Sequence, residues 1–275
     1  MDVMDVRWIY DKAEKLAEEL DEEKYPETVD FLEEVILGGD YSGYTAYEIA
    51  SDLCIRDMPA DFDSRIIDYI TELFKFEIDM GNDAAMNDLG AQYYDGNRGF
   101  KQDFNLAIEY YKMAAEKGNR QSCENLGYCY YYGRDGEPDY EKAFHYFALG
   151  AFDGHLISLY KVGDMYYNGY YVEKNLKEAF YIYTRCLETM TEEAEKNCAG
   201  PIYLRLGKMF FNGYGTEKDL RTALTCFQRA ESYLYAMVVD DGNYMYKKSL
   251  QGAIDGQAMV REELAKAIPE RNFAF

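Results

Sequence analysis

One motif returns four times along this chain of 275 residues and limits its fold more than any other feature. It reads Leu or Val, Gly, two variable residues, two aromatic residues, one variable residue, and Gly. The first glycines of the copies are 37, 36 and 44 residues apart, and an alanine follows each at an offset of 16 or 17. They are Gly90, Gly127, Gly163 and Gly207. Self-similarity at this period is typical of an array in which one small structural unit stacks on the next.

Each repeat predicts a hairpin of two helices. In the second copy, Cys123, Leu126, Gly127 and Tyr130 stand at i, i+3, i+4 and i+7, which places them on one face of a first helix, helix A. The glycines that close the motif are expected to end helix A, because glycine adopts left-handed backbone angles without steric cost. They are Gly96, Gly133, Gly169 and Gly213.

A second helix, helix B, follows a polar loop in each repeat. The loops end in residues suited to cap a helix N-terminus, namely Asp103, Asp139, Asn175 and Asp219. Gly90 and Ala107 fall at matched places in helices A and B of the first hairpin. We expect these small residues to let the two helix backbones approach closely, while aromatic rings fill the wider gaps between hairpins.

The flanking segments are predicted to be helical as well. A degenerate hairpin is expected, with helices near Thr45–Cys54 and Phe62–Met80, and two amphipathic helices precede it. A long helix from about Tyr244 to Ile268 is expected to cap the array. The eight extra residues between the third and fourth repeats, in Thr191–Pro201, are expected to lengthen helix B and add a loop. The predicted divisions are an acidic helical region (1–80), the repeats (81–236) and a capping helix (237–275).

The net charge of −22 is concentrated near the N-terminus, where residues 1–80 hold 23 acidic and 7 basic side chains. Such a field repels phosphate groups, so we expect no binding to nucleic acid or to anionic membranes. Two interpretations of the acidic surface stay open. It is either a solvated surface or a face that steers a basic partner toward the chain.

Location and cofactor content follow from what the sequence lacks. It has no apolar run of about 18 residues, which a membrane span requires, and no signal peptide at the start. Its six cysteines are scattered without a C-x-x-C pair. We therefore expect a cytoplasmic protein with reduced cysteines. Neither histidine has a cysteine at a familiar ligand spacing, so no metal and no cofactor are expected.

Enzymatic chemistry finds little support. No catalytic motif is present, and the segment Gly213–Thr216 resembles a phosphate-binding loop only superficially, since it follows a helix rather than a strand. His145 is expected to pack on helix B and His155 to point to solvent. Two alternatives to a protein-binding function stay open. The chain is either an accessory domain of an enzyme complex or a structural protein that self-associates through the first helix, which carries Trp8 and Ile9. We expect a monomer or weak self-association.

The repeated motif, with its polar loop and following alanine, resembles the Sel1-like repeat family, a relative of the tetratricopeptide repeat. The segment Ala114–Gly118 is the best match to the family's pattern, and the resemblance covers residues 81–236 and, more weakly, 45–80. It implies an all-α fold, a right-handed α–α solenoid of antiparallel hairpins with the A helices on the concave side. It also implies a scaffold for protein–protein interaction with no catalysis of its own.

The resemblance also implies where a partner binds. In tetratricopeptide relatives the ligand-facing residues lie six and three positions before the motif glycine and one and four after it. Carried onto this chain, the positions that bear contact or charged side chains are Asn87, Tyr94, Glu124, Tyr128, Tyr131, Tyr160, Asp164, Tyr167, Lys208 and Phe211. The hypothesis is a tyrosine-lined, acidic concave surface that binds a peptide or helix of another protein. The competing interpretation is that these rings only pack between repeats.

Overall fold

The computed structural model describes residues 6–38, 44–56 and 63–266, with the side chains of 193–195 left aside. Across these residues all regular structure is helical, so the predicted all-α class is confirmed. Contacts divide the chain into two compact units, unit 1 (Met1–Pro138) and unit 2 (Asp139–Phe275), which we describe separately. In the same described part, no helix is both long and apolar enough to cross a membrane.

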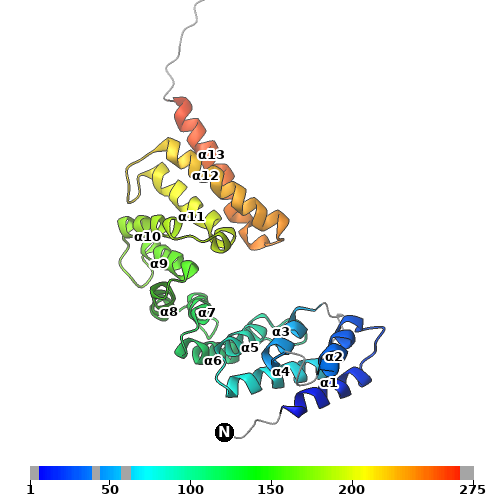
Figure 1. Ribbon diagram of the computed structural model, residues 1–275. Helices are drawn as coiled ribbons and strands as arrows, with labels where there is room; N and C mark the ends of the chain where they lie inside the picture. The colour runs from blue at the N-terminus through cyan, green and yellow to red at the C-terminus, as the bar shows by residue number, and fades with distance from the viewer. Residues whose placement is uncertain (1–5, 39–43, 57–62, 267–275) are drawn as a thin grey trace, which may run out of the picture. The chain divides into compact units, whose positions relative to one another are not determined.

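Unit 1 is built from helices that pack in consecutive pairs, α1 with α2, α3 with α4 and α5 with α6 (Figure 1). Their bounds are α1 (Arg7–Glu19), α2 (Pro26–Gly38), α3 (Ala46–Ile55), α4 (Ser64–Asp79), α5 (Asp83–Asp95), α6 (Phe104–Glu116) and α7 (Arg120–Tyr131). The helices predicted near Thr45–Cys54 and Phe62–Met80 are present as α3 and α4. Thr45 caps α3 in a reciprocal capping box with Glu48.

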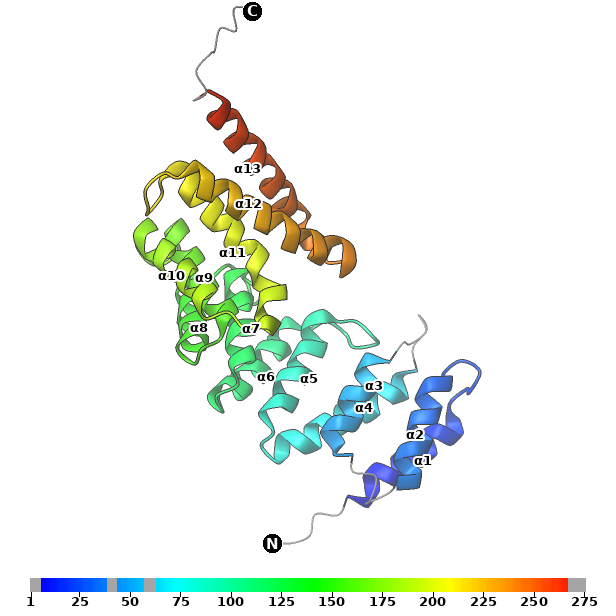
Figure 2. The same ribbon diagram turned by 45° about the horizontal axis from the view of Figure 1, so that its top comes forward.

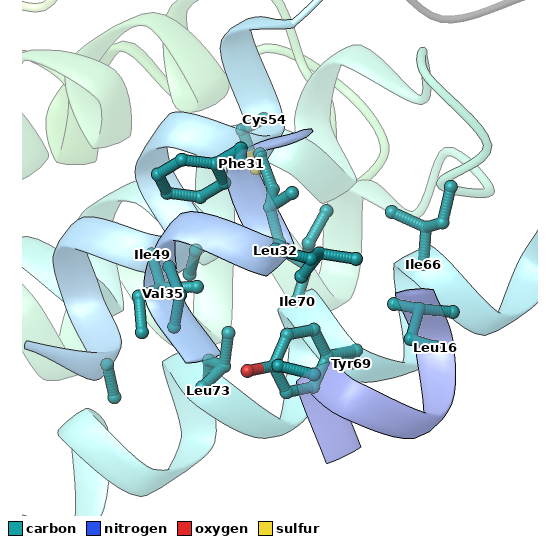
Figure 3. Packing of buried hydrophobic residues seen from close by; sticks show 14 of the residues in the cluster. Leu16, Phe31, Leu32, Val35, Ile49, Cys54, Ile66, Tyr69, Ile70 and Leu73 are labelled. Atoms are coloured by element: carbon teal, nitrogen blue, oxygen red, sulfur yellow. The ribbon is translucent and has the colours of Figure 1, made fainter. Parts of the chain in front are cut away.

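The core of unit 1 joins helices α1 to α4 (Figure 3). Leu32, Ile49 and Leu73, from three different helices, have no exposed surface. Ile9 lies in the same core, and Trp8 packs edge-to-face on Phe76, with ring centroids 5.6 Å apart. Ile9 is therefore not available as the self-association contact expected from the sequence, because α2 and α4 pack on α1 and bury it.

Unit 2 holds six α-helices within the described residues, and its last helix packs on the two before it. Their bounds are α8 (Tyr140–Phe152), α9 (Leu156–Asn168), α10 (Leu176–Glu188), α11 (Glu192–Asn212), α12 (Leu220–Tyr235) and α13 (Lys247–Lys266). Figure 2 shows α13 lying along α12. The predicted capping helix is thus present, but small residues face inward. Gly256 packs so closely that the ring of Phe227 occupies the space that its Cβ would need, whereas Ile254 and Met259 are exposed.

The extra residues before the fourth repeat were assigned to the wrong helix. Helix α10 ends at Glu188, and α11 begins at Glu192 and continues through Pro201 for 21 residues in all. The insertion therefore lengthens helix A of the fourth repeat, not helix B of the third. Proline disfavours a helix interior, but burial of Cys198 and Ile202 beside it offsets that cost.

The predicted ends of the hairpin helices are confirmed. The side chains of Asp103, Asp139, Asn175 and Asp219 each accept a backbone N–H at the start of helix B. The close approach expected at Gly90 is present, because a Cβ there would lie 3.2 Å from the backbone oxygen of Ala107, but a ring lies closer still. A Cβ on Gly90 or Gly163 would lie 2.9 Å from the ring of Tyr111 or Tyr183, which belongs to helix B of the same hairpin. The glycine makes room for an aromatic ring inside the hairpin, not only for a neighbouring backbone.

Candidate functional site

Polar contacts join successive A helices within each unit, and they mark the surface where the sequence places a partner. The A helices of the four repeats are α5 and α7 in unit 1 and α9 and α11 in unit 2. Asn87 on α5 accepts hydrogen bonds through Oδ1 from Ser122 Oγ (2.8 Å) and Asn125 Nδ2 (3.1 Å), both on α7. Fixed polar links of this kind hold neighbouring helices in one register.

The same network extends to the degenerate hairpin. Asn87 Nδ2 donates to Asp88 Oδ1 (3.1 Å), and Asp88 Oδ2 accepts from the hydroxyl of Tyr47 on α3 (2.8 Å). Burial, and then the hydrogen bond to Asp88, raise the pKa of Tyr47 to about 12. Three successive helices, α3, α5 and α7, are therefore linked by side chains.

An aromatic cluster lies at the C-terminal ends of α5 and α7. We use this name for Tyr94, Phe104, Tyr128, Tyr131 and Tyr132. Tyr94 meets Phe104 edge-to-face at 5.3 Å, Tyr128 lies parallel to Tyr132 at 6.0 Å, and Tyr131 meets Tyr132 edge-to-face at 5.1 Å between ring centroids. Mutual contact of this kind holds each ring in one orientation.

The guanidinium of Arg134 lies among the rings of this cluster. Its central carbon is 4.9 Å from the Phe104 centroid, 5.5 Å from that of Tyr94 and 5.7 Å from that of Tyr132. Its Nε donates to the Tyr94 hydroxyl at 3.1 Å. A cation within about 6 Å of a ring centroid is attracted to the ring's electron density. In the described part of the chain, no carboxylate pairs with Arg134.

Unit 2 contains a buried ion cluster between α9 and α11. Asp164 is only 3% exposed. It accepts hydrogen bonds from Arg205 Nε (2.9 Å) and Nη2 (3.1 Å), from the Tyr183 hydroxyl (2.7 Å) and from Lys161 Nζ (3.5 Å). Burial opposes ionisation of this carboxyl, but Arg205 and then Lys161 outweigh it and hold the pKa of Asp164 below its ordinary value.

Sequence reasoning missed Arg205, although a signal for it was present. Arg205 lies two residues before its motif glycine, a position outside the four offsets taken from tetratricopeptide relatives. The same position in the other repeats also carries a polar or charged residue: Asp88, Asn125 and Lys161. Asp88, Asn125 and Arg205 each bond to a residue of a neighbouring A helix.

The ten residues proposed from the sequence fall into three groups. Asn87, Glu124, Tyr160 and Asp164 are buried. Tyr94, Tyr128, Tyr131, Tyr167 and Phe211 are half-buried, and Lys208 is exposed. The buried group supports the surface rather than forming it; Glu124, for example, accepts a hydrogen bond from Gln121 Nε2 at 2.9 Å. Tyr128 is half-buried because its ring stacks on that of Tyr132.

The two histidines lie in different surroundings. His155 does not point freely to solvent as expected, because it precedes α9 half-buried with Nδ1 3.2 Å from Ser158 Oγ. His145 is exposed and packs on Tyr146. Two hollows, of about 180 Å³ between α1 and α4 and about 300 Å³ between α4 and α6, contain neither histidine in their walls.

The cysteines are positioned as structural residues. All six are buried, and none of them forms a disulfide. Burial raises the pKa of Cys129 and of Cys186 to about 12, which keeps these thiols protonated and unreactive. Over the described residues, no group of three or more potential metal ligands is present.

Comparison with known families identifies the hairpins. The sequence model of the Sel1 repeat matches residues 83–119, 120–155, 156–185 and 203–232. The chain carries four Sel1 repeats. Its repeat region belongs to the Sel1 repeat family, whose members are generally non-enzymatic scaffolds for protein–protein interaction. Helices α5 to α12 are the helices of these Sel1 repeats, two to a repeat.

Two solved structures are similar to this chain. A Sel1 repeat protein from Oxalobacter formigenes is similar to this chain with 24% identity and a TM-score of 0.50, over 67% of this chain and 79% of that one. The protective antigen c5321 of uropathogenic Escherichia coli, described as having an SLR fold, matches with 19% identity and a TM-score of 0.49, over 85% of this chain and 56% of that one. No curated protein matches the chain. The first likeness supports the α–α solenoid fold expected for Sel1 repeats.

Proposed function

We propose that this Sel1 repeat protein is a non-enzymatic scaffold that binds a peptide or helix of another protein on the surface formed by its A helices. The observation that carries the proposal is the aromatic cluster of unit 1, which is half-buried, internally packed and already in contact with a guanidinium group. Tyrosines held in this way offer contact area at low cost in side-chain entropy.

The contacts of Arg134 indicate which partner chemistry fits the aromatic cluster. Three rings and one hydroxyl of the cluster contact the guanidinium of Arg134. An arginine or lysine of a partner can make the same contacts, either next to Arg134 or by displacing it. The net charge of −22 attracts basic segments toward the chain before contact. Both features favour the interpretation of a basic partner for unit 1.

Unit 2 offers a second, smaller surface, which we consider by itself. Tyr167 and Phe211 are half-buried at the ends of α9 and α11, and each ring is approached by a lysine from the following loop, Lys174 and Lys218. We include both rings in the proposed contact surface.

We propose a cytoplasmic location for the protein, as a monomer or with weak self-association. Six buried cysteines without a disulfide among them support the location, because reduced thiols persist in the cytosol.

The test is affinity capture from the source cell followed by quantitative mass spectrometry, with three versions of the chain. They are the wild type, the double variant Tyr128→Ala/Tyr131→Ala, and a matched control, Tyr181→Ala/Tyr235→Ala. The control removes two tyrosines that are 59% and 53% exposed on B helices. Circular dichroism and a thermal melt check that each version folds.

We expect a specific set of proteins to be lost from the Tyr128→Ala/Tyr131→Ala sample and retained by the control. Loss of one well-packed contact tyrosine costs about 1–2 kcal/mol of binding, so the double variant should reduce capture at least tenfold. Equal capture by the two folded double variants would argue against the proposed surface.

A further inference from the structure

Two cations of α11, Arg205 and Lys208, lie beside the buried carboxylate of Asp164 in unit 2. Lys161 and Arg205 both contact the one carboxylate of Asp164. Lys208 follows Arg205 by three residues on α11, which places it on the same side of the helix. Burial, and then the nearby Arg205 guanidinium, lower the pKa of Lys208. The carboxylate of Asp164 raises this pKa, but by less. Arg205 and Lys208, both on α11, therefore lie beside one carboxylate, that of Asp164.

Several hydrogen-bond donors at this cluster have no acceptor. Arg205 uses Nε and Nη2 for Asp164, and its Nη1 bonds to nothing in the described part of the chain. The same holds, among the residues described, for Lys208 Nζ and for the hydroxyl of Tyr167. Tyr167 follows Asp164 by three residues on α9, which places it on the same side of that helix as the carboxylate that Arg205 contacts.

The position of these donors is fixed by the buried contacts beneath them. Two hydrogen bonds to Asp164 hold the guanidinium plane, and the ring of Tyr160 lies against it with its centroid 5.7 Å from the central carbon. A guanidinium that is already oriented loses little entropy when its remaining N–H groups bind an acceptor. The positive charge of Arg205 and Lys208 is local, because the chain as a whole is strongly acidic.

We propose that Tyr167, Arg205 and Lys208 form a site that receives a carboxylate side chain from an acidic segment of a partner protein. The two oxygens of a carboxylate match donors from a guanidinium, an ammonium and a hydroxyl, and its charge is opposite to that of Arg205 and Lys208. This inference rests on the proposed role of the A helices in binding proteins and adds a ligand class for unit 2. The two units then differ in preference, since the aromatic cluster of unit 1 favours a cation.

The test is fluorescence anisotropy of the full chain with a defined probe. The probe is a short glycine–serine peptide that carries several glutamates and an uncharged dye, and its reference is the same peptide with glutamines. The net charge of the chain repels the glutamate peptide, so any preference for it arises from a local site. We expect the glutamate peptide to bind more tightly, with an affinity that falls as salt is raised.

Lys208→Gln is the informative variant, and Lys177→Gln is its control. Both remove one positive charge from an exposed lysine of unit 2, but Lys177 lies on α10, a B helix. Lys208→Gln should weaken glutamate-peptide binding about tenfold, because it removes one charge-assisted hydrogen bond. Lys177→Gln should change it less than about twofold, as expected for a distant screened charge. Arg205 is left intact, because its removal would leave Asp164 buried without its main partner.

Two results would overturn the proposal: equal affinity for the glutamate and glutamine peptides, or equal losses from Lys208→Gln and Lys177→Gln in folded proteins. The Tyr128→Ala/Tyr131→Ala variant separates this proposal from the general one. It should lose partner capture through unit 1 and keep glutamate-peptide binding in unit 2, so each proposal can fail without the other.

Discussion

Removal of Arg205 should destabilise unit 2 more than removal of the aspartate it contacts. Asp164 has a side chain that is only 4% exposed, while that of Arg205 is 24% exposed. Arg205→Met leaves a buried carboxylate with Lys161 at 3.5 Å and the Tyr183 hydroxyl as partners. Breaking a buried pair in this way costs about 3–5 kcal/mol, and the partial exposure of Arg205 favours the lower end, about 3 kcal/mol.

Asp164→Asn should lower the free energy of unfolding by less, about 1–2 kcal/mol, because water can reach the Arg205 guanidinium that loses its carboxylate partner. The double variant Asp164→Asn/Arg205→Met should cost less than the sum of the two single variants, since no unpaired carboxylate then stays buried. A coupling of about 1–3 kcal/mol is typical of residues in direct contact.

The advantage of the wild type over Asp164→Asn should also depend on pH, with a definite sign. The pKa of Asp164 is depressed in the folded state, so ionisation contributes stability above the unfolded-state pKa of about 3.9. That contribution is lost as the pH falls through the lower, folded-state pKa. The difference between the two proteins should therefore be constant near neutral pH and shrink below about pH 4.

The assay is urea unfolding followed by two signals. Far-UV circular dichroism reports the helices of both units, and the fluorescence of Trp8, the one tryptophan in the sequence, reports unit 1 alone. We expect the substitutions to change the circular dichroism transition. If Arg205→Met costs less than about 1 kcal/mol, or if the double variant is as unstable as the two single losses added together, the guanidinium does not neutralise a buried carboxylate and the reasoning is refuted.

Two further predictions concern packing. Gly207→Ala should destabilise unit 2 by about 1–2 kcal/mol, because the new Cβ would lie 2.8 Å from the Phe227 ring and this clash outweighs the better helix propensity of alanine. Gly252→Ala should instead stabilise unit 2 by about 0.5–1 kcal/mol, because the atom nearest to its Cβ lies 3.9 Å away. Thermal melts should show a lower melting temperature for the first variant and a higher one for the second, and a change in the same direction for both would contradict the prediction. Arg134→Gln should lower the stability of unit 1 by less than about 1 kcal/mol. It should also raise the affinity of the aromatic cluster for a short arginine-bearing peptide, measured by fluorescence anisotropy, because the rings lose the cation that they contact within the chain. An unchanged affinity would show that Arg134 does not compete with the peptide for the cluster.

The sequence by itself determined the hairpins and their ends. Asp103 and Asn175 cap helix B and Gly96 ends helix A because these choices depend on one residue and its immediate neighbours. The period of the motif then led to the solenoid and to the Sel1 repeat, since a unit that cannot bury its own apolar face must stack on a copy of itself.

Only the tertiary structure decided which polar residues meet. Arg205 and Asp164 are 41 residues apart, and Asn87 and Ser122 are 35 apart, so each pair exists only because successive A helices lie side by side. Offsets within one repeat assigned Asp164 and Asn87 to a binding surface, whereas packing between repeats buried them. Local sequence sets the face on which a side chain leaves its helix, but the neighbouring helix sets whether that face meets water, a charge or a ring.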